Sequence, residues 1–193
     1  MMDTMRVVIA DDESIRLMSL KAQLEALGLQ VVGEALNGRQ AVDLVIRLKP
    51  DLAILDIKMP EMDGLEAAKQ IAAQYPIPVI VVTAYSERTL AERAIEAGVF
   101  SYLMKPISEE DLLPAILLAK SRFREFQDLT KGISDLKEAL ETRKLIERAK
   151  GILMERRNLS EAEAFRRMQI QSQNENKKLA EIAQAIIMAD RML

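Results

Sequence analysis

The sequence has no cysteine, no histidine and no tryptophan among its 193 residues. Without cysteine there can be no disulfides, thiolate catalysis or zinc–thiolate sites, and without histidine the most common general base and metal ligand is missing. Any metal ion would therefore bind to oxygen ligands, which favours Mg²⁺, Ca²⁺ or Mn²⁺. Aromatic residues make up only 4% of the chain, so we do not expect aromatic stacking platforms for single-stranded nucleic acid.

Long apolar runs are also missing. None approaches the roughly 18 residues that a membrane-spanning helix needs. Residues 1–6 do not have the basic flank and apolar core of a secretory signal. Hydrophobic residues form 49% of the chain and charged residues 30%, as in soluble globular proteins. We therefore expect a cytoplasmic protein that makes no contact with a membrane.

Charge divides the chain into two parts. Residues 1–121 carry 12 Lys and Arg against 18 Asp and Glu, whereas residues 122–193 carry 15 against 12. Within the second part, residues 143–167 hold eight basic and four acidic residues. This asymmetry indicates two functional parts, and the basic one either faces a polyanion or is simply a solvated helical surface.

The first part alternates strand-like and helix-like segments. Short runs of apolar or β-branched residues are separated by segments whose apolar residues lie three and four positions apart. Runs that are apolar throughout are typical of strands covered on both faces, as in a parallel sheet. Residues 1–121 are therefore predicted to form an α/β domain with a doubly wound, five-stranded parallel sheet. The expected strands are residues 6–10, 30–33, 52–55, 78–82 and 100–104.

The second part is predicted to be helical throughout. Beyond residue 114 there is no proline, and Gly132 and Gly151 are the only glycines. In residues 122–141, five apolar residues alternate three and four positions apart, which predicts a helical stalk with a short coiled-coil seam. The seam residues are Phe126, Leu129, Ile133, Leu136 and Leu140.

Residues 142–193 are predicted to form a small three-helix all-α domain at the end of this stalk. Ser160 and Glu163 have the spacing of a capping box, which marks the start of a helix. Asn174 or Asn176 is expected to cap the beginning of the last helix.

Polar side chains stand at the ends of four of the five predicted strands: Asp11 and Asp12, Asp56, Thr83, and Lys105. In open α/β sheets the ligand site lies beyond the carboxyl ends of the strands. Three converging carboxylates would repel one another without a cation, and Mg²⁺ prefers a few carboxylates with water and phosphoryl oxygens. One carboxylate can then act as a nucleophile and become an aspartyl phosphate. Taken singly, each residue is more often a helix cap or a surface residue, so the prediction depends on the combination.

The motifs around these positions resemble the receiver domain of two-component response regulators. They are residues 10–13 (ADDE), 55–60 (LDIKMP) followed by Asp63–Gly64, 82–84 (VTA) and 102–106 (YLMKP). The resemblance covers about residues 4–121 and implies the strand order 2-1-3-4-5, a flavodoxin-like arrangement.

The resemblance also implies a role for each carboxylate. Asp56 would accept a phosphoryl group from a sensor histidine kinase or a small phosphodonor. Mg²⁺ would bind directly to Asp12, Asp56 and the backbone carbonyl of Lys58, and through water to Asp11. The absence of histidine fits this scheme, because the donor histidine belongs to the kinase.

The remaining motif residues would bind the phosphoryl group or change position when it is present. By the resemblance, Thr83 and Lys105 contact the phosphoryl oxygens, and the peptide bond before Pro106 is cis. Tyr102 matches an aromatic residue that turns inward when Thr83 moves toward the phosphate. The alternative for Tyr102 is an ordinary packed core tyrosine.

In the tail, residues 146–154 (IERAKGILM) and 159–165 (LSEAEAF) resemble the ANTAR output domain. The resemblance implies binding of RNA stem-loops by dimers and regulation of transcription termination in bacteria. The resemblance spans about residues 133–190. The chain departs from the usual pattern at Gln169, where arginine is common, and at Ser172–Gln173, where an Ala-Met pair is common.

Several tail residues are candidates for RNA contact. Lys150, Met154 and Arg157 are spaced to share one helix face. Gly151 lies in mid-helix, where glycine costs about 1 kcal/mol against alanine, so it indicates close approach of either an RNA backbone or a neighbouring helix. The other candidates are Arg143, Arg166 and Arg167.

Together these observations predict a response regulator that is phosphorylated on Asp56 and binds RNA hairpins as an antiterminator. The partner expected besides the kinase and RNA is a second copy of the chain, bound through the stalk or the receiver face. The alternatives are an adaptor whose tail binds protein, and a DNA-binding regulator, for which a basic recognition helix is not apparent. Phosphatases and phosphotransferases of the aspartyl-phosphate type carry a second acid where this chain has Lys58, so we expect no enzyme activity beyond phosphotransfer to itself and slow self-dephosphorylation.

Overall fold

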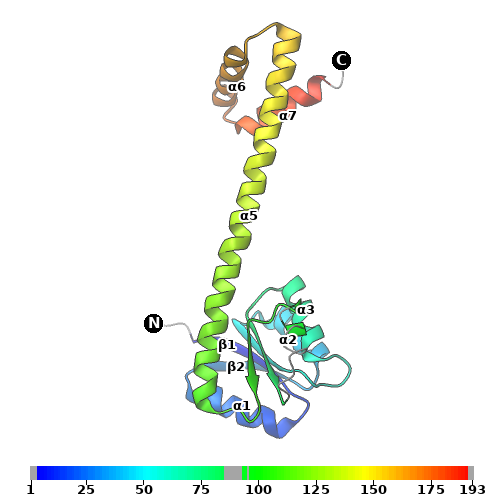
Figure 1. Cartoon of the computed structure of the whole chain (residues 1–193), viewed down its shortest axis with the longest axis vertical. Coiled ribbons are helices and arrows are strands. Elements are labelled where there is room, and N and C mark those ends of the chain that lie inside the picture. Colours follow the sequence, from blue (N-terminus) through cyan, green and yellow to red (C-terminus); the bar gives the residue numbers. More distant parts are fainter. Residues whose placement is uncertain (1–3, 85–92, 95, 191–193) are drawn as a thin grey trace. The chain divides into compact units, whose positions relative to one another are not determined.

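The computed structural model describes residues 4–84, 93–94 and 96–190. It divides into two compact units, residues 1–127 and 128–193. In the described part of the chain, no helix is both long and apolar enough to span a membrane. The first unit (blue to green in Figure 1) contains five strands. They are β1 (Arg6–Ala10), β2 (Gln30–Ala35), β3 (Leu52–Asp56), β4 (Val79–Thr83) and β5 (Ser101–Met104).

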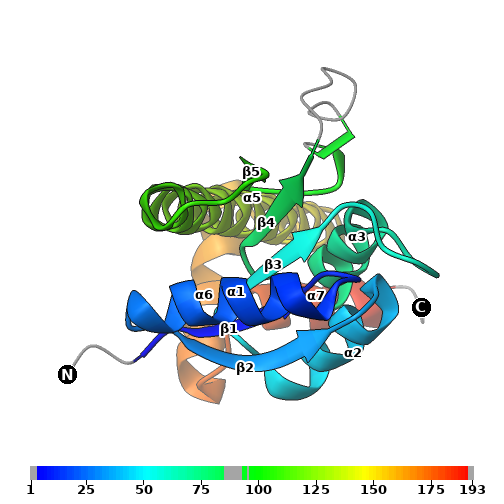
Figure 2. The ribbon, with the colours of Figure 1, turned by 90° about the horizontal axis from the view of Figure 1, so that it is seen from below.

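These strands form one parallel sheet with the order β2-β1-β3-β4-β5, which can be followed in Figure 2. This confirms the predicted fold class and strand order. The order reverses at β1, because β2 lies on one side of it and β3 on the other. A ligand site is therefore expected beyond the carboxyl ends of β1 and β3.

Helices cover both faces of the sheet. Helix α1 (Ser14–Ala26) and the first turns of α5 (Glu109–Arg157) pack on one face, and α2 (Gly38–Leu48) and α3 (Gly64–Gln74) pack on the other. Successive strand residues point to opposite faces, so Ile9 joins the core under α1 and Val8 the core under α2. Every residue of β3 and β4 is buried, which explains why their sequences are apolar rather than alternating.

Helix α5 is continuous over 49 residues. Just before its first turn, the backbone N–H and the hydroxyl of Ser108 both donate to the Asp111 carboxylate. It ends at Asn158, which has a left-handed backbone (φ 52°). The predicted helical stalk, residues 122–141, is thus part of one longer helix.

The C-terminal unit (ending in red in Figure 1) adds α6 (Glu161–Glu175) and α7 (Leu179–Asp190) to the last turns of α5. Ser160 and Glu163 form the predicted capping box. The prediction that Asn174 or Asn176 starts the last helix is wrong: Asn176 is left-handed and ends α6. The three helices share a small core, which is Ala149, Met168, Ile182, Ala183 and Ile187.

The five seam residues of the stalk lie on the surface. Phe126, Leu129, Ile133, Leu136 and Leu140 are 53–72% exposed. Isolated exposed apolar residues are ordinary, but five at coiled-coil spacing form a continuous apolar stripe.

Candidate functional site

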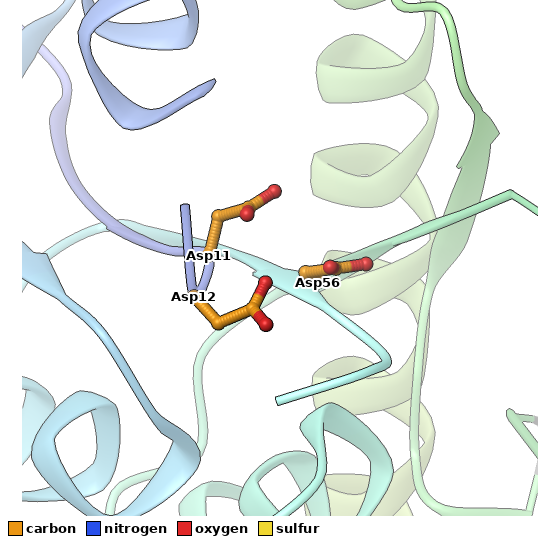
Figure 3. A group of neighbouring side chains, drawn as sticks. All are labelled: Asp11, Asp12 and Asp56. Carbon is orange, nitrogen blue, oxygen red and sulfur yellow. The ribbon is translucent and has the colours of Figure 1, made fainter. Parts of the chain in front are cut away.

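Three carboxylates gather beyond the switch point of the sheet, at the ends of β1 and β3 (Figure 3). Asp11 and Asp12 follow β1, and Asp56 is the last residue of β3. One oxygen from each lies within 4.8 Å of the others. Asp11 and Asp56 are buried, whereas Asp12 stands at the exposed rim. The structure therefore brings together the three carboxylates that the sequence singled out.

Lys105 closes the cluster on the side of β5. Its ammonium donates to Asp11 Oδ2 at 2.8 Å and lies 2.9 Å from Asp56 Oδ2. The backbone N–H of Lys105 donates to the Thr83 carbonyl at 2.8 Å, which places the loop after β5 beside the end of β4. The Lys105–Pro106 peptide bond is cis. Residues from β1, β3 and β5 thus meet at one point.

The surroundings of Asp56 destabilise its anionic form. Burial raises the pKa of Asp56, and the negative charge of Asp11 raises it further, while Lys105 acts in the opposite direction. A buried carboxylate beside a second one is stabilised by additional positive charge. Oxygen ligands in this arrangement suit Mg²⁺, the ion that receiver domains generally bind.

Arg16 of α1 also belongs to this cluster, and the sequence analysis missed it. Its Nη1 lies 3.5 Å from Asp11 Oδ1, 3.9 Å from Asp12 Oδ1 and 3.9 Å from Asp56 Oδ2. The available signal was its position four residues after Asp12 at the start of a predicted helix, where side chains share a face. Arg16 is partly exposed, so its charge is screened by solvent more than that of Lys105.

The start of α3 packs directly against the backbone of Asp56 and Ile57. The N–H of Gly64 donates to the Ile57 carbonyl at 2.9 Å, and a Cβ at Gly64 would lie 2.1 Å from the Asp56 carbonyl oxygen. Asp63 caps α3 by accepting the Glu66 N–H at 2.7 Å. Only glycine fits this close approach, which gives the Asp63–Gly64 motif a structural reason.

The other predicted receiver residues lie around the cluster. Thr83 is buried at the end of β4, and β4 runs beside β3. Lys58 follows Ile57 in the loop after β3, with its side chain exposed. Tyr102 is 58% exposed, so the packed-core interpretation of this residue is wrong.

A cavity of about 470 Å³ opens beside the cluster. Asp11, Asp56, Lys105 and Arg16 line it, together with apolar residues such as Leu20 and Ile107. The two carboxylates at its wall are therefore accessible to a small donor molecule.

In the C-terminal unit, the three residues expected on one helix face all lie on α5 but differ in burial. Lys150 is only 8% exposed. Its ammonium donates to Glu161 Oε1 at 2.7 Å and lies 2.9 Å from Glu147 Oε1, and these carboxylates raise the pKa of Lys150. Met154 and Arg157 are exposed. Lys150 therefore joins α5 to the first turn of α6, and its ammonium is already paired with carboxylates, unlike the exposed Arg157.

The remaining tail candidates are on the surface. Arg143, Arg166 and Arg167 are exposed, and Arg157 and Arg167 line the same cavity. No described atom outside its own helix backbone and neighbouring residues lies within 4 Å of the Cβ position of Gly151. The interpretation of Gly151 as a site of tight helix packing is therefore wrong.

Comparison with known proteins agrees with this division of the chain. The family model of the response regulator receiver domain matches residues 7–117, and that of the ANTAR domain matches residues 134–187. The transcriptional regulatory protein PdtaR of Mycobacterium tuberculosis is 45% identical over 182 residues, which are 94% of this chain and 89% of PdtaR. The chemotaxis protein CheY of Thermotoga maritima is 38% identical over 58% of this chain and 93% of its own length.

Solved structures match the first unit. The receiver domain of NarL from M. tuberculosis has a TM-score of 0.56 and 30% identity, covering 59% of this chain and 94% of that chain. The receiver domain of a modulated diguanylate cyclase from Desulfovibrio desulfuricans has a TM-score of 0.59 and 33% identity, covering 63% and 98%. The sheet order, the carboxylate cluster and both family models lead to one conclusion: the chain belongs to the response regulators that carry a receiver domain followed by an ANTAR domain.

Proposed function

We propose that the protein is phosphorylated on Asp56 and that phosphorylation controls the binding of RNA hairpins by its ANTAR domain, which regulates transcription termination. The observation that carries this proposal is the meeting of Asp56 with Asp11, Asp12 and Lys105 at the switch point of the sheet. The phosphodonor is a sensor histidine kinase or a small acyl phosphate.

The transfer step follows from the position of Asp56. A carboxylate oxygen of Asp56 forms a bond to phosphorus while the bond from phosphorus to the donor breaks, and the donor keeps the electron pair of that bond. Mg²⁺, held by Asp12, Asp56 and the Lys58 carbonyl, would neutralise charge on the phosphoryl oxygens. The Lys105 ammonium and the Thr83 hydroxyl would bind the added oxygens.

A connection between this site and the stalk is supported by an aromatic cluster in the first unit. Phe100 directly precedes β5, and its ring packs edge-on against Phe123 and Phe126 of α5, with ring centres 5.2 and 5.9 Å apart. Arg122 donates to the Phe100 carbonyl at 3.3 Å. A shift of β5, in response to the phosphoryl group at Lys105 and Thr83, would therefore reach the stalk directly.

The exposed seam of the stalk supports pairing with a second copy of the chain. With Phe126, Ile133 and Leu140 at a positions, Leu129 and Leu136 take the d positions. The heptad centred on Ile133 and Leu136 has the β-branched a residue and the leucine d residue that favour two-stranded parallel coiled coils. Two tethered ANTAR domains would gain affinity for RNA without new contacts.

Substitution of Leu136 by Glu should abolish the dimer, measured by sedimentation velocity.

The test uses the full-length protein with acetyl phosphate and Mg²⁺. Intact mass should show one added phosphoryl group on wild type and none on Asp56→Asn. Asp43→Asn, on the exposed face of α2, is the charge-matched control and should behave as wild type. Pull-down of total RNA should enrich hairpin transcripts with the phosphorylated protein more than with Asp56→Asn.

Each result of the pull-down has a distinct meaning. Equal recovery of RNA by wild type and Asp56→Asn would remove phosphorylation from the proposal. Competition by double-stranded DNA but not by hairpin RNA would favour the DNA-binding alternative. Recovery of protein without nucleic acid would favour the adaptor.

A further inference from the structure

A cavity of about 260 Å³ lies in the C-terminal unit, where the last turns of α5 meet α6 and α7. Its apolar residues come from all three helices, and the buried Met168 is one of them. Three arginines also line the cavity, two from α5 and one from α6. The apolar residues used below are Ile152, Met168 and Ile186, and the arginines are Arg156, Arg157 and Arg167.

We propose that this cavity binds one unpaired nucleobase of an RNA loop, with the arginines contacting its face and the adjoining phosphates. The inference rests on the proposed function, that this domain binds RNA hairpins, and names the part of the domain that reads the loop. Proteins recognise RNA loops largely through splayed bases that stack on aromatic rings or guanidinium groups. The domain has few aromatic residues, so arginine is the stacking group that it offers.

The size and the lining of the cavity suit a single base. Pockets for drug-sized ligands span about 300–1,000 Å³, and this cavity is slightly smaller. The apolar residues would cover the face of a base, while Gln171 and Asp190 at the wall offer polar atoms to its edge. An apolar cavity without arginine, or arginine without the cavity, would not select a base together with its phosphate.

One arginine of the cavity is oriented by an ion pair. Arg156 Nε donates to Asp190 Oδ1 at 2.9 Å, which joins α5 to the end of α7. A guanidinium group that is already oriented loses less conformational entropy when a ligand binds. The planar group of Arg156 is therefore prepared for stacking or for a phosphate contact before RNA arrives.

Charge favours this cavity over the surface around Lys150. There, Lys150 forms ion pairs with both Glu147 and Glu161. Two carboxylates beside one ammonium leave a net negative charge, which repels phosphates. The cavity instead combines three arginines with one aspartate. Phosphate groups are drawn to the side with excess positive charge.

The first experiment measures base binding directly. Full-length protein with ¹³C-labelled Ile and Met methyl groups is titrated with each of the four nucleoside 5′-monophosphates, and ribose 5-phosphate is the control without a base. The methyl signals of Ile152, Met168 and Ile186 should shift in a saturable way in the millimolar range, because an aromatic base would lie against them. Ribose 5-phosphate should leave them unchanged. Absence of these shifts with all four nucleotides, or equal shifts with ribose 5-phosphate, would overturn the inference.

The second experiment fills the cavity without changing charge. Ala189 lines it and is exposed, so Ala189→Leu occupies the space without overpacking the core. Ala185→Leu, on an exposed position of α7 outside the cavity, is the matched control. Ala189→Leu should lower the affinity for the hairpin RNA recovered in the pull-down about tenfold, the loss expected for one stacked base. Ala185→Leu should bind as wild type.

A charge-matched pair completes the test. Arg157→Gln and Arg148→Gln remove the same charge from α5, but Arg148 does not line the cavity. A larger loss of RNA affinity in Arg157→Gln supports the inference, and equal losses in the two variants contradict it. If the wild-type protein binds no RNA at all, the proposed function fails. If it binds RNA but neither Ala189→Leu nor Arg157→Gln differs from its control, only the base-binding cavity is wrong.

Discussion

Replacement of Gly151 by alanine tests two consequences of the structure at once. No described atom beyond its own helix backbone and adjacent residues lies within 4 Å of the position that an alanine Cβ would occupy. The methyl group therefore meets none of the other described side chains, and its expected intramolecular effect is on helix stability. Glycine in a helix interior is about 1 kcal/mol less favourable than alanine. Gly151→Ala should thus raise the free energy of unfolding of the C-terminal unit by about 1 kcal/mol.

The expected gain is measurable by thermal unfolding. For a unit of this size, 1 kcal/mol corresponds to a rise in Tm of about 4–8 °C, followed by circular dichroism. If an RNA backbone approaches α5 at Gly151, the same methyl group obstructs it. A steric conflict of about 1–3 kcal/mol would then lower hairpin affinity by about tenfold, measured by fluorescence anisotropy.

The control is a second glycine of the same helix. Around Gly132, too, no described atom beyond its own helix backbone and adjacent residues lies within 4 Å of the Cβ position, but this glycine lies in the stalk. Gly132→Ala should raise stability and keep RNA affinity. A Gly151→Ala protein that is less stable than wild type would refute the reasoning from open space, and one that is more stable with unchanged RNA affinity would refute close approach of RNA at this position.

Three further predictions concern single contacts. Gly64→Ala should destabilise the first unit by about 1–3 kcal/mol and prevent phosphorylation in the acetyl phosphate assay, because the added Cβ displaces the Asp56 backbone. Arg16→Gln should tighten Mg²⁺ binding about fivefold by isothermal titration, since about 1 kcal/mol of a partly exposed ion pair no longer competes for the three carboxylates. Lys150→Met should lower the Tm at pH 7. Because Lys150 holds the pKa of Glu161 below its ordinary value of 4.5, that bond stabilises the fold above pH 4.5 and is lost as the pH falls through the lower, folded-state pKa. The Tm difference should therefore shrink below pH 4.5, and an unchanged difference there would contradict the pairing.

Much of the first unit could be predicted from the sequence because its signals are local. A strand buried on both faces has to be apolar at every position, and β3 and β4 are buried throughout. The site followed from topology, since carboxyl ends of parallel strands meet at one edge of the sheet. Asp11, Asp12 and Asp56 lie together for that reason.

Contacts between elements could not be predicted in this way. Periodicity shows which residues share a helix face, but not which charged residue another helix presents to that face. Lys150 is bound by Glu161, which lies eleven positions away across a turn. The role of Gly151 was ambiguous for the same reason, because the sequence alone does not show whether another helix packs against this position.

Ion pairs join some of the basic residues of the tail to other helices and leave others unpaired in the described part of the chain. Lys150 and Arg156 each bind an acidic residue of another helix, Glu161 and Asp190, and so hold α5 to α6 and to α7. In the described part of the chain, Arg157 forms no comparable ion pair and stands at the cavity beside Arg156. A net positive charge on a helical surface is by itself only weakly informative. It becomes a specific RNA-binding hypothesis because two exposed arginines, Arg157 and Arg167, stand together at a cavity that apolar side chains also line.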